Sequence, residues 1–186
     1  MANQVIAESA AALARLQIAV IQRFVSNLRD TYETEAKRLG ALIDEADRQD
    51  YADYLADQHL TEVEVVELGG QLAMVALYRV IELSTKSLLR FRYRGAAASL
   101  YKFDVLAARL QSDLSVDLRS VTNFASIDEI RLINNAVKHD GKVSNALSQY
   151  PGWTRGDELT GLEQAFDRLA PSVPDYLIAL AKVVVP

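Results

Sequence analysis

The feature that most constrains the fold of this chain is a long helical periodicity at its N-terminus. Apolar residues recur at steps of three, four or seven over residues 3–48, and no proline interrupts them. Such spacing places side chains on one face of an α-helix. We predict one long helix or two stacked helices here, with Gly40 as the soft point. The face predicted to be apolar carries Ile6, Leu13, Leu16, Val20, Phe24, Leu28 and Tyr32.

A second long helix is predicted after an acidic connection at Asp44–His59. Thr61-Glu62-Val63-Glu64 has the form of a capping box, in which a threonine and a glutamate three residues later satisfy the free amides of a helix start. The helix is expected to run to about Tyr93. Gly69-Gly70 would loosen it or allow a neighbouring element to approach closely. Its apolar stripe carries Met74, Leu77, Ile81 and Leu88.

Two shorter helices are predicted next. The first covers Tyr101–Gln111, with Val105, Leu106 and Leu110 facing inward. The second follows another capping box, Ser126-Ile127-Asp128-Glu129, and covers about residues 127–140. Gly141 lies where a left-handed residue commonly ends a helix.

The C-terminal part is predicted to hold two further helices. A third capping box, Thr160-Gly161-Leu162-Glu163, starts a helix that runs to Ala170 and is stopped by Pro171. Pro174 suits the first turn of a last helix, which ends near Val184. Every strong signal is therefore helical. We predict an all-α antiparallel bundle with two long helices and several short C-terminal helices, forming a single domain over residues 1–186.

Composition limits the chemistry and the compartment. The chain has no cysteine, which excludes disulfides, thiolate metal sites and a cysteine nucleophile. The longest uncharged apolar stretch is Leu68–Tyr78, 11 residues, well short of the roughly 20 that span a bilayer. No basic leader precedes the first helix. We expect a cytoplasmic protein without membrane contact.

The net charge of −5 is unevenly distributed. Residues 28–68 hold twelve acids and four bases, a net charge of −8, whereas residues 79–94 have a net charge of +4. Two solvated faces of opposite sign explain this distribution. A local basic patch that can meet a polyanion is the alternative explanation.

The helix predicted over residues 127–140 carries the strongest sign of chemistry. At about 100° per residue, Arg131, Asn135 and His139 share one polar strip with Asp128. Asn134 and Lys138 lie on its shoulder, and the opposite face is apolar. An imidazole, an amide and two cations so placed can hold a phosphate and move protons.

A structural explanation of the same residues also stands. Lys138 and His139 are the types that the carbonyl end of a helix favours through its dipole. Asp128 and Glu129 suit the first turn for the same reason. Asn134 would then be a half-buried amide with its hydrogen bonds made.

The motif resembles that of HEPN domains (higher eukaryotes and prokaryotes nucleotide-binding). Their signature is an arginine, then four to six residues, then a histidine near the end of a late helix, often written Arg-Asn-x-x-x-His. Here Glu129-Ile130-Arg131 is followed by Asn134-Asn135-Ala136-Val137-Lys138-His139. Upstream, residues 78–86 look like the family's earlier long helix, with Glu82 and Lys86 facing the bundle.

The resemblance implies a helical bundle that forms a homodimer and often acts as a metal-independent endoribonuclease in defence or toxin–antitoxin systems. It implies RNA or a nucleotide as ligand, an antitoxin as partner protein, and neither metal nor cofactor. His139 would be the base and Asn135 a positioning amide. Arg131, Lys138, Asn134 and Lys86 would hold phosphate, with Glu82 as a supporting acid. Glu82 and Lys86, at i and i+4, equally suit an ordinary helix pair.

One departure divides the functional hypotheses. Asn134 stands at the family's arginine position, and an amide cannot supply positive charge. Either Arg131 or Lys138 replaces it, or the chain keeps binding without cleavage. The second hypothesis is a non-catalytic interaction or dimerisation module. Trp153, between Pro151-Gly152 and Thr154, suits either a loop anchored to the core or a lid or dimer contact.

Overall fold

A computed structural model describes residues 2–44, 49–93 and 103–185 of the chain. Two long helices, α1 (Ala2–Asp44) and α2 (Gln49–Arg92), run antiparallel side by side. They are followed by α3 (Phe103–Leu114), α4 (Phe124–His139), α5 (Leu162–Leu169) and α6 (Ser172–Val184). Short 3-10 turns lie at Leu118–Ser120 and Leu147–Gln149. The predicted all-α bundle with two long helices is confirmed, and the described residues contain no strand.

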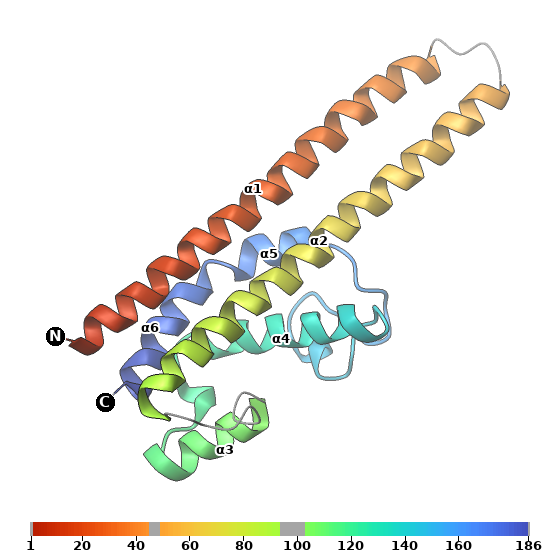
Figure 1. Cartoon of the computed structure of the whole chain (residues 1–186). Helices are drawn as coiled ribbons and strands as arrows, with labels where there is room; N and C mark the ends of the chain where they lie inside the picture. The colour runs from red at the N-terminus through yellow and green to blue at the C-terminus, as the bar shows by residue number, and fades with distance from the viewer. Residues whose placement is uncertain (1, 45–48, 94–102, 186) are drawn as a thin grey trace.

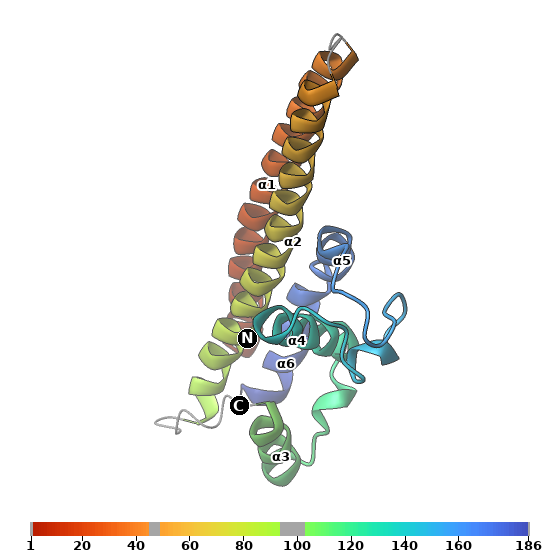
Figure 2. The same cartoon turned by 90° about the vertical axis from the view of Figure 1, so that its right-hand side faces the viewer.

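The shorter helices gather at one end of the long pair. α6 packs against both α1 and α2, while α4 and α5 contact α2. The other halves of α1 and α2 project past α5 as a two-helix arm, which both views show (Figures 1 and 2). The core draws on every α-helix and includes the fully buried Met74, Leu77 and Phe166.

The predicted apolar face of α1 is wrong for four of its seven residues, while Ile6, Leu28 and Tyr32 are partly buried. Leu13, Leu16, Val20 and Phe24 are 55%, 64%, 60% and 47% exposed. The buried side chains of α1 are instead Ala7, Ala11, Ala14, Ile18, Val25 and Leu39. Alanines allow α1 to lie close to α2 and α6, because small side chains reduce the distance between packed helices. Leu13, Leu16, Val20 and Phe24 are left on the outer face.

The glycine pair in α2 has the second of the two predicted roles. α2 passes through Gly69 and Gly70 without interruption, and both are buried. A Cβ on Gly70 would lie 3.0 Å from the backbone nitrogen of Glu163, at the start of α5. A Cβ on Gly69 would overlap the Leu28 side chain of α1. The glycines therefore let α1 and α5 approach α2 closely.

All three capping-box predictions are wrong in position. α2 begins at Gln49, so Thr61 lies inside a helix and the predicted connection at Asp44–His59 is largely helical, with 45–48 outside the described residues. α4 begins at Phe124 after Asn123, which has φ 61° and makes no side-chain cap. α5 begins after Gly161, at φ 68°. A Ser/Thr-x-x-Glu pattern also occurs inside helices, where the backbone amides already donate to carbonyls of the preceding turn and no capping acceptor is required.

Other boundaries are closer to expectation. Gly141 has φ 66° and its amide bonds to the Ala136 carbonyl at 2.9 Å, so it ends α4 as predicted. α6 ends at Val184 with Pro174 in its first turn, also as predicted. Leu106 and Leu110 of α3 are buried, but Val105 is 41% exposed, contrary to prediction. The predicted start of that helix at Tyr101 lies outside the described residues.

One segment passes a length and composition test for membrane spanning. It is Asn3–Leu42 of α1, and 22% of its most apolar window is buried within the protein. The segment is not an uncharged run, because Glu8 and Arg15 interrupt it, and the prediction from sequence is based on uncharged runs alone. The expected absence of membrane contact stays a prediction.

Candidate functional site

α4 forms one wall of the candidate site. Its apolar residues Ile127, Ile130, Ile133 and Ala136 are buried. Because these side chains fix the rotation of the helix, its polar strip faces outward from the core. The residues predicted to act together on that strip reach three different surroundings.

Arg131 is the most firmly held residue of the strip. Its Nε and Nη2 both lie close to Asp128 Oδ1, at 2.8 and 2.7 Å. Its Cζ lies 4.5 Å from the centroid of the Phe103 ring, a cation–π contact. The Tyr150 hydroxyl donates to Asp128 Oδ2 at 2.8 Å. Burial, together with this bond to Asp128, raises the pKa of Tyr150, so the donor stays protonated at neutral pH.

A cavity of about 50 Å³ lies between α2, α3, α4 and α6. Arg131 lines it together with Tyr78, Glu82, Lys86 and Tyr176, so it joins three of the predicted site residues: Glu82, Lys86 and Arg131. The charged residues of its lining have a net charge of +1. Burial raises the pKa of Tyr176 and of Tyr78, which keeps both hydroxyls neutral hydrogen-bonding groups.

Glu82 bridges two cations. Its Oε1 accepts from Lys86 Nζ at 2.5 Å and its Oε2 from Arg79 Nη1 at 2.7 Å. Burial alone would raise the pKa of Glu82, but the hydrogen bonds and charges of Lys86 and Arg79 outweigh it and the pKa is lowered. Glu82 and Lys86 therefore form the ordinary helix pair, and they also face the cavity beside α4.

His139 and Asn135 do not join this cavity. Both are exposed, and His139 follows Arg131 by eight residues, about 12 Å along the helix axis. Lys138 lines a separate groove on the other side of Glu82, together with Arg79 and residues of α1. The three predicted catalytic residues therefore do not converge within one copy of the chain.

Asn134 is buried rather than turned to solvent. It is 1% exposed, and its Nδ2 makes only a long contact of 3.5 Å with Asn135 Oδ1. Its Oδ1 has no hydrogen-bond partner among the described residues. An unpartnered buried acceptor costs free energy, so Asn134 does not fit the alternative of a fully hydrogen-bonded amide.

Sequence reasoning missed Glu129, which links α4 to Trp153 in the following loop and to Arg168 of α5. Glu129 is 3% exposed and accepts from Trp153 Nε1 at 2.7 Å and from Arg168 Nη2 and Nη1 at 2.6 and 3.1 Å. These bonds raise the pKa of Arg168. The predicted loop-anchoring role of Trp153 agrees with this contact. A signal existed: at about 100° per residue, Glu129 falls beside Ile133 on the apolar face, where a carboxylate needs partners.

The described residues contain no group of three or more His, Cys, Asp or Glu that could hold a metal ion. Comparison of this chain with protein-family models, with curated proteins and with solved structures finds no match.

Proposed function

We propose that this chain is a HEPN-like protein that binds a phosphate group of RNA or of a nucleotide at the cavity between α2 and α4. The observation that carries the proposal is that Lys86 of α2 and Arg131 of α4, both selected from the sequence, line the same cavity. A lysine and an arginine from two helices are a common way to hold a phosphate.

The surroundings of Arg131 favour binding through a fixed donor. Asp128 takes Nε and Nη2, which leaves Nη1 without a hydrogen bond among the described residues. The guanidinium carbon also lies over the Phe103 ring, 4.5 Å from its centroid. A donor whose orientation is fixed in advance loses less conformational entropy when a ligand binds.

The size and charge of the cavity define the ligand group. Its volume of about 50 Å³ is far below the roughly 300–1,000 Å³ of sites that enclose a whole small molecule. It suits a single phosphate-sized group, with the rest of the ligand outside. The cation-rich stretch from Arg79 to Arg92 adjoins it and would attract a polyanion, while the acidic stretch 28–68 would repel one.

The proposal is binding without cleavage. RNA cleavage by a histidine base needs that base within hydrogen-bond reach of the ribose hydroxyl beside the phosphate. His139 and Arg131 are about 12 Å apart along α4, so one copy cannot place both on one phosphate. The endoribonuclease activity that the resemblance implies is therefore the less supported alternative.

Binding is tested with a short fluorescent single-stranded RNA at low salt, followed by anisotropy. We expect Arg131→Ala and Lys86→Ala each to weaken binding roughly tenfold, because each removes one charged contact to phosphate. Arg15→Ala is the matched control, since Arg15 is exposed on α1, which contributes no residue to the cavity lining. Inorganic phosphate should compete. Unchanged affinity in both cavity variants would contradict the proposal.

Cleavage is tested by incubating the same RNA with the protein in chelator and resolving the products on a gel. We expect no product that depends on His139, so the wild type and His139→Ala should give the same pattern. Metal-free cleavage that His139→Ala loses would overturn binding without cleavage and would establish the endoribonuclease instead.

A further inference from the structure

Three uncharged hydroxyl groups line the cavity between α2, α3, α4 and α6, in addition to its charged residues. They belong to Tyr78 and Thr85 of α2 and to Tyr176 of α6. These three side chains make no hydrogen bond among the described residues. Tyr176 is 3% exposed, yet its hydroxyl is not one of the polar atoms that are enclosed in the core without a partner. Because buried hydroxyls normally have a hydrogen-bond partner, these groups are free to bind a molecule inside the cavity.

The cavity is closed on its inner side. Leu106 of α3, Leu118 of the first 3-10 turn and Ile127 of α4 line it, and all three are buried in the core. The charged residues lie on the more open side, since the side chains of Arg131 and Glu82 are 23% and 29% exposed. In both views, α3 and α6 lie at the end of α2 opposite the projecting arm (Figures 1 and 2). A group that enters past the charged residues therefore ends against an apolar wall.

A closed cavity distinguishes between the two kinds of phosphate in a nucleic acid. An internal phosphodiester has a sugar on both sides, so its chain would have to leave the cavity in two directions. A terminal phosphate monoester has one ester bond and three further oxygens that accept hydrogen bonds. A cavity of about 50 Å³ with a closed inner side has room for the terminal group and not for a chain that continues beyond it.

We propose that the cavity holds the terminal phosphate of an RNA, and that Tyr78, Thr85 and Tyr176 donate hydrogen bonds to it beside Arg131. This site rests on the proposed phosphate binding and adds to it the end of the ligand that is bound and three binding residues outside the predicted set. Burial raises the pKa of Tyr78 and of Tyr176, so both hydroxyls keep the proton that they donate.

Hydroxyl donors suit this cavity because the charges around it are already engaged. Glu82 accepts from Lys86 and Arg79 at 2.5 and 2.7 Å. Asp128 accepts from Arg131 at 2.8 Å. A phosphate bound by these cations alone would compete with two carboxylates. The neutral hydroxyls and the remaining Nη1 of Arg131 can donate to phosphate without breaking either ion pair, and hydrogen bonds to a charged acceptor are stronger than those between neutral groups.

The ends of the RNA test the site, because water is the other molecule that the hydroxyls would bind and a cavity that holds only water would not distinguish RNA ends. Three RNAs of one sequence are compared: one with a 5′-phosphate, one with a 3′-phosphate and one with hydroxyls at both ends. Each carries its fluorophore on an internal base, and binding is followed by anisotropy at low salt. We expect a terminal phosphate to tighten binding roughly tenfold, and the end that does so is the end that enters the cavity.

Two substitutions that keep the shape of the side chain test the hydroxyls. Tyr176→Phe and Thr85→Val should each lower the affinity for the phosphorylated RNA roughly fivefold to tenfold and leave the affinity for the hydroxyl-ended RNA unchanged. Tyr32→Phe is the matched control, since α1 contributes no residue to the cavity lining. Thermal unfolding followed by circular dichroism should show that each variant is folded at the temperature of the binding assay.

The results distinguish a terminal-phosphate site from phosphate binding in general. If the three RNAs bind equally well and Arg131→Ala weakens all of them, phosphate binding stands and the terminal-phosphate site is wrong. If Tyr176→Phe and Thr85→Val both keep the full preference for a terminal phosphate, the hydroxyls are not its ligands and the site is again wrong. If none of the RNAs binds, the proposed binding of RNA fails, and the terminal-phosphate site is overturned with it.

Discussion

Replacing Arg168 by alanine is expected to lower the free energy of unfolding by about 2–3 kcal/mol at neutral pH. The substitution removes the cation that faces Glu129, a carboxylate only 3% exposed. Loss of one partner from a fully buried pair costs roughly 3–5 kcal/mol, because the other charge is left uncompensated. Arg168 itself is 51% exposed, so water can partly replace it and the expected loss is smaller. Urea unfolding followed by circular dichroism measures the effect.

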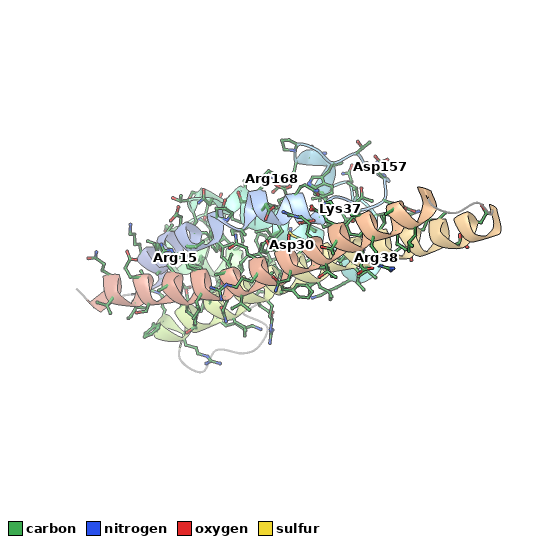
Figure 3. The ribbon with its side chains drawn as sticks, turned by 90° about the horizontal axis from the view of Figure 1, so that it is seen from above. Arg15, Asp30, Lys37, Arg38, Asp157 and Arg168 are labelled. Atoms are coloured by element: carbon green, nitrogen blue, oxygen red, sulfur yellow. The ribbon has the colours of Figure 1, made fainter. Side chains whose placement is uncertain are left out.

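Two comparisons separate this charge effect from lost packing. Arg15 is also exposed on a helix, and Figure 3 shows it well apart from Arg168. Arg15→Ala should change stability by at most about 0.5 kcal/mol. Glu129→Gln/Arg168→Ala should be more stable than Arg168→Ala alone, because glutamine still accepts from Trp153 and buries no charge. A double variant no more stable than Arg168→Ala alone would assign the effect to packing.

The helical class of the fold could be predicted because helical periodicity depends on neighbours in sequence. The end of α4 at Gly141 and the end of α6 at Val184 follow from local rules on left-handed glycine and on proline. The helix starts could not be predicted in the same way. The pattern at Thr61 is compatible with both a helix start and a helix interior, and only the packing of α2 along α1 decides between them.

The candidate site was predictable residue by residue but not as a constellation. Glu82, Lys86 and Arg131 were all selected from the sequence, and tertiary packing of α2 against α4 brings them to one cavity. His139 lies on the same strip of α4 as Arg131. It follows Arg131 by eight residues, about 12 Å along the helix, and this distance is longer than any one phosphate contact. The partners of Glu129 lie 24 and 39 residues further along the chain, so local rules could not name them.

The face of α1 shows most clearly where local hydrophobicity misleads. Leucine is more apolar than alanine, so hydrophobicity alone predicts that the large residues of α1 face the core. The short distance between α1 and its neighbouring helices leaves room for alanines there instead. α1 lies against α2 and α6 through Ala7, Ala11 and Ala14, which are 2%, 0% and 0% exposed. Leu13, Leu16, Val20 and Phe24 therefore form an exposed apolar surface along the outer side of α1.

Replacing Ala14 by leucine is therefore expected to lower the free energy of unfolding by about 3 kcal/mol. Ala14 is fully buried between closely packed helices, and extra methylene groups there force side chains off their preferred rotamers or move the backbone. Leu16→Ala, two residues away, should change the stability of the monomer by at most about 0.5 kcal/mol, since Leu16 is 64% exposed. Both are measured by urea unfolding followed by circular dichroism.

The two substitutions form a test of helix rotation with opposite outcomes. If the large residues of α1 faced the core, Leu16→Ala would cost roughly 2–5 kcal/mol through a cavity, and Ala14→Leu would be nearly neutral on the outside. That result would rotate α1 by roughly half a turn and remove Val20 and Phe24 from the groove beside α2. The predicted result keeps them there, because the same rotation that buries Ala14 turns Val20 and Phe24 toward that groove.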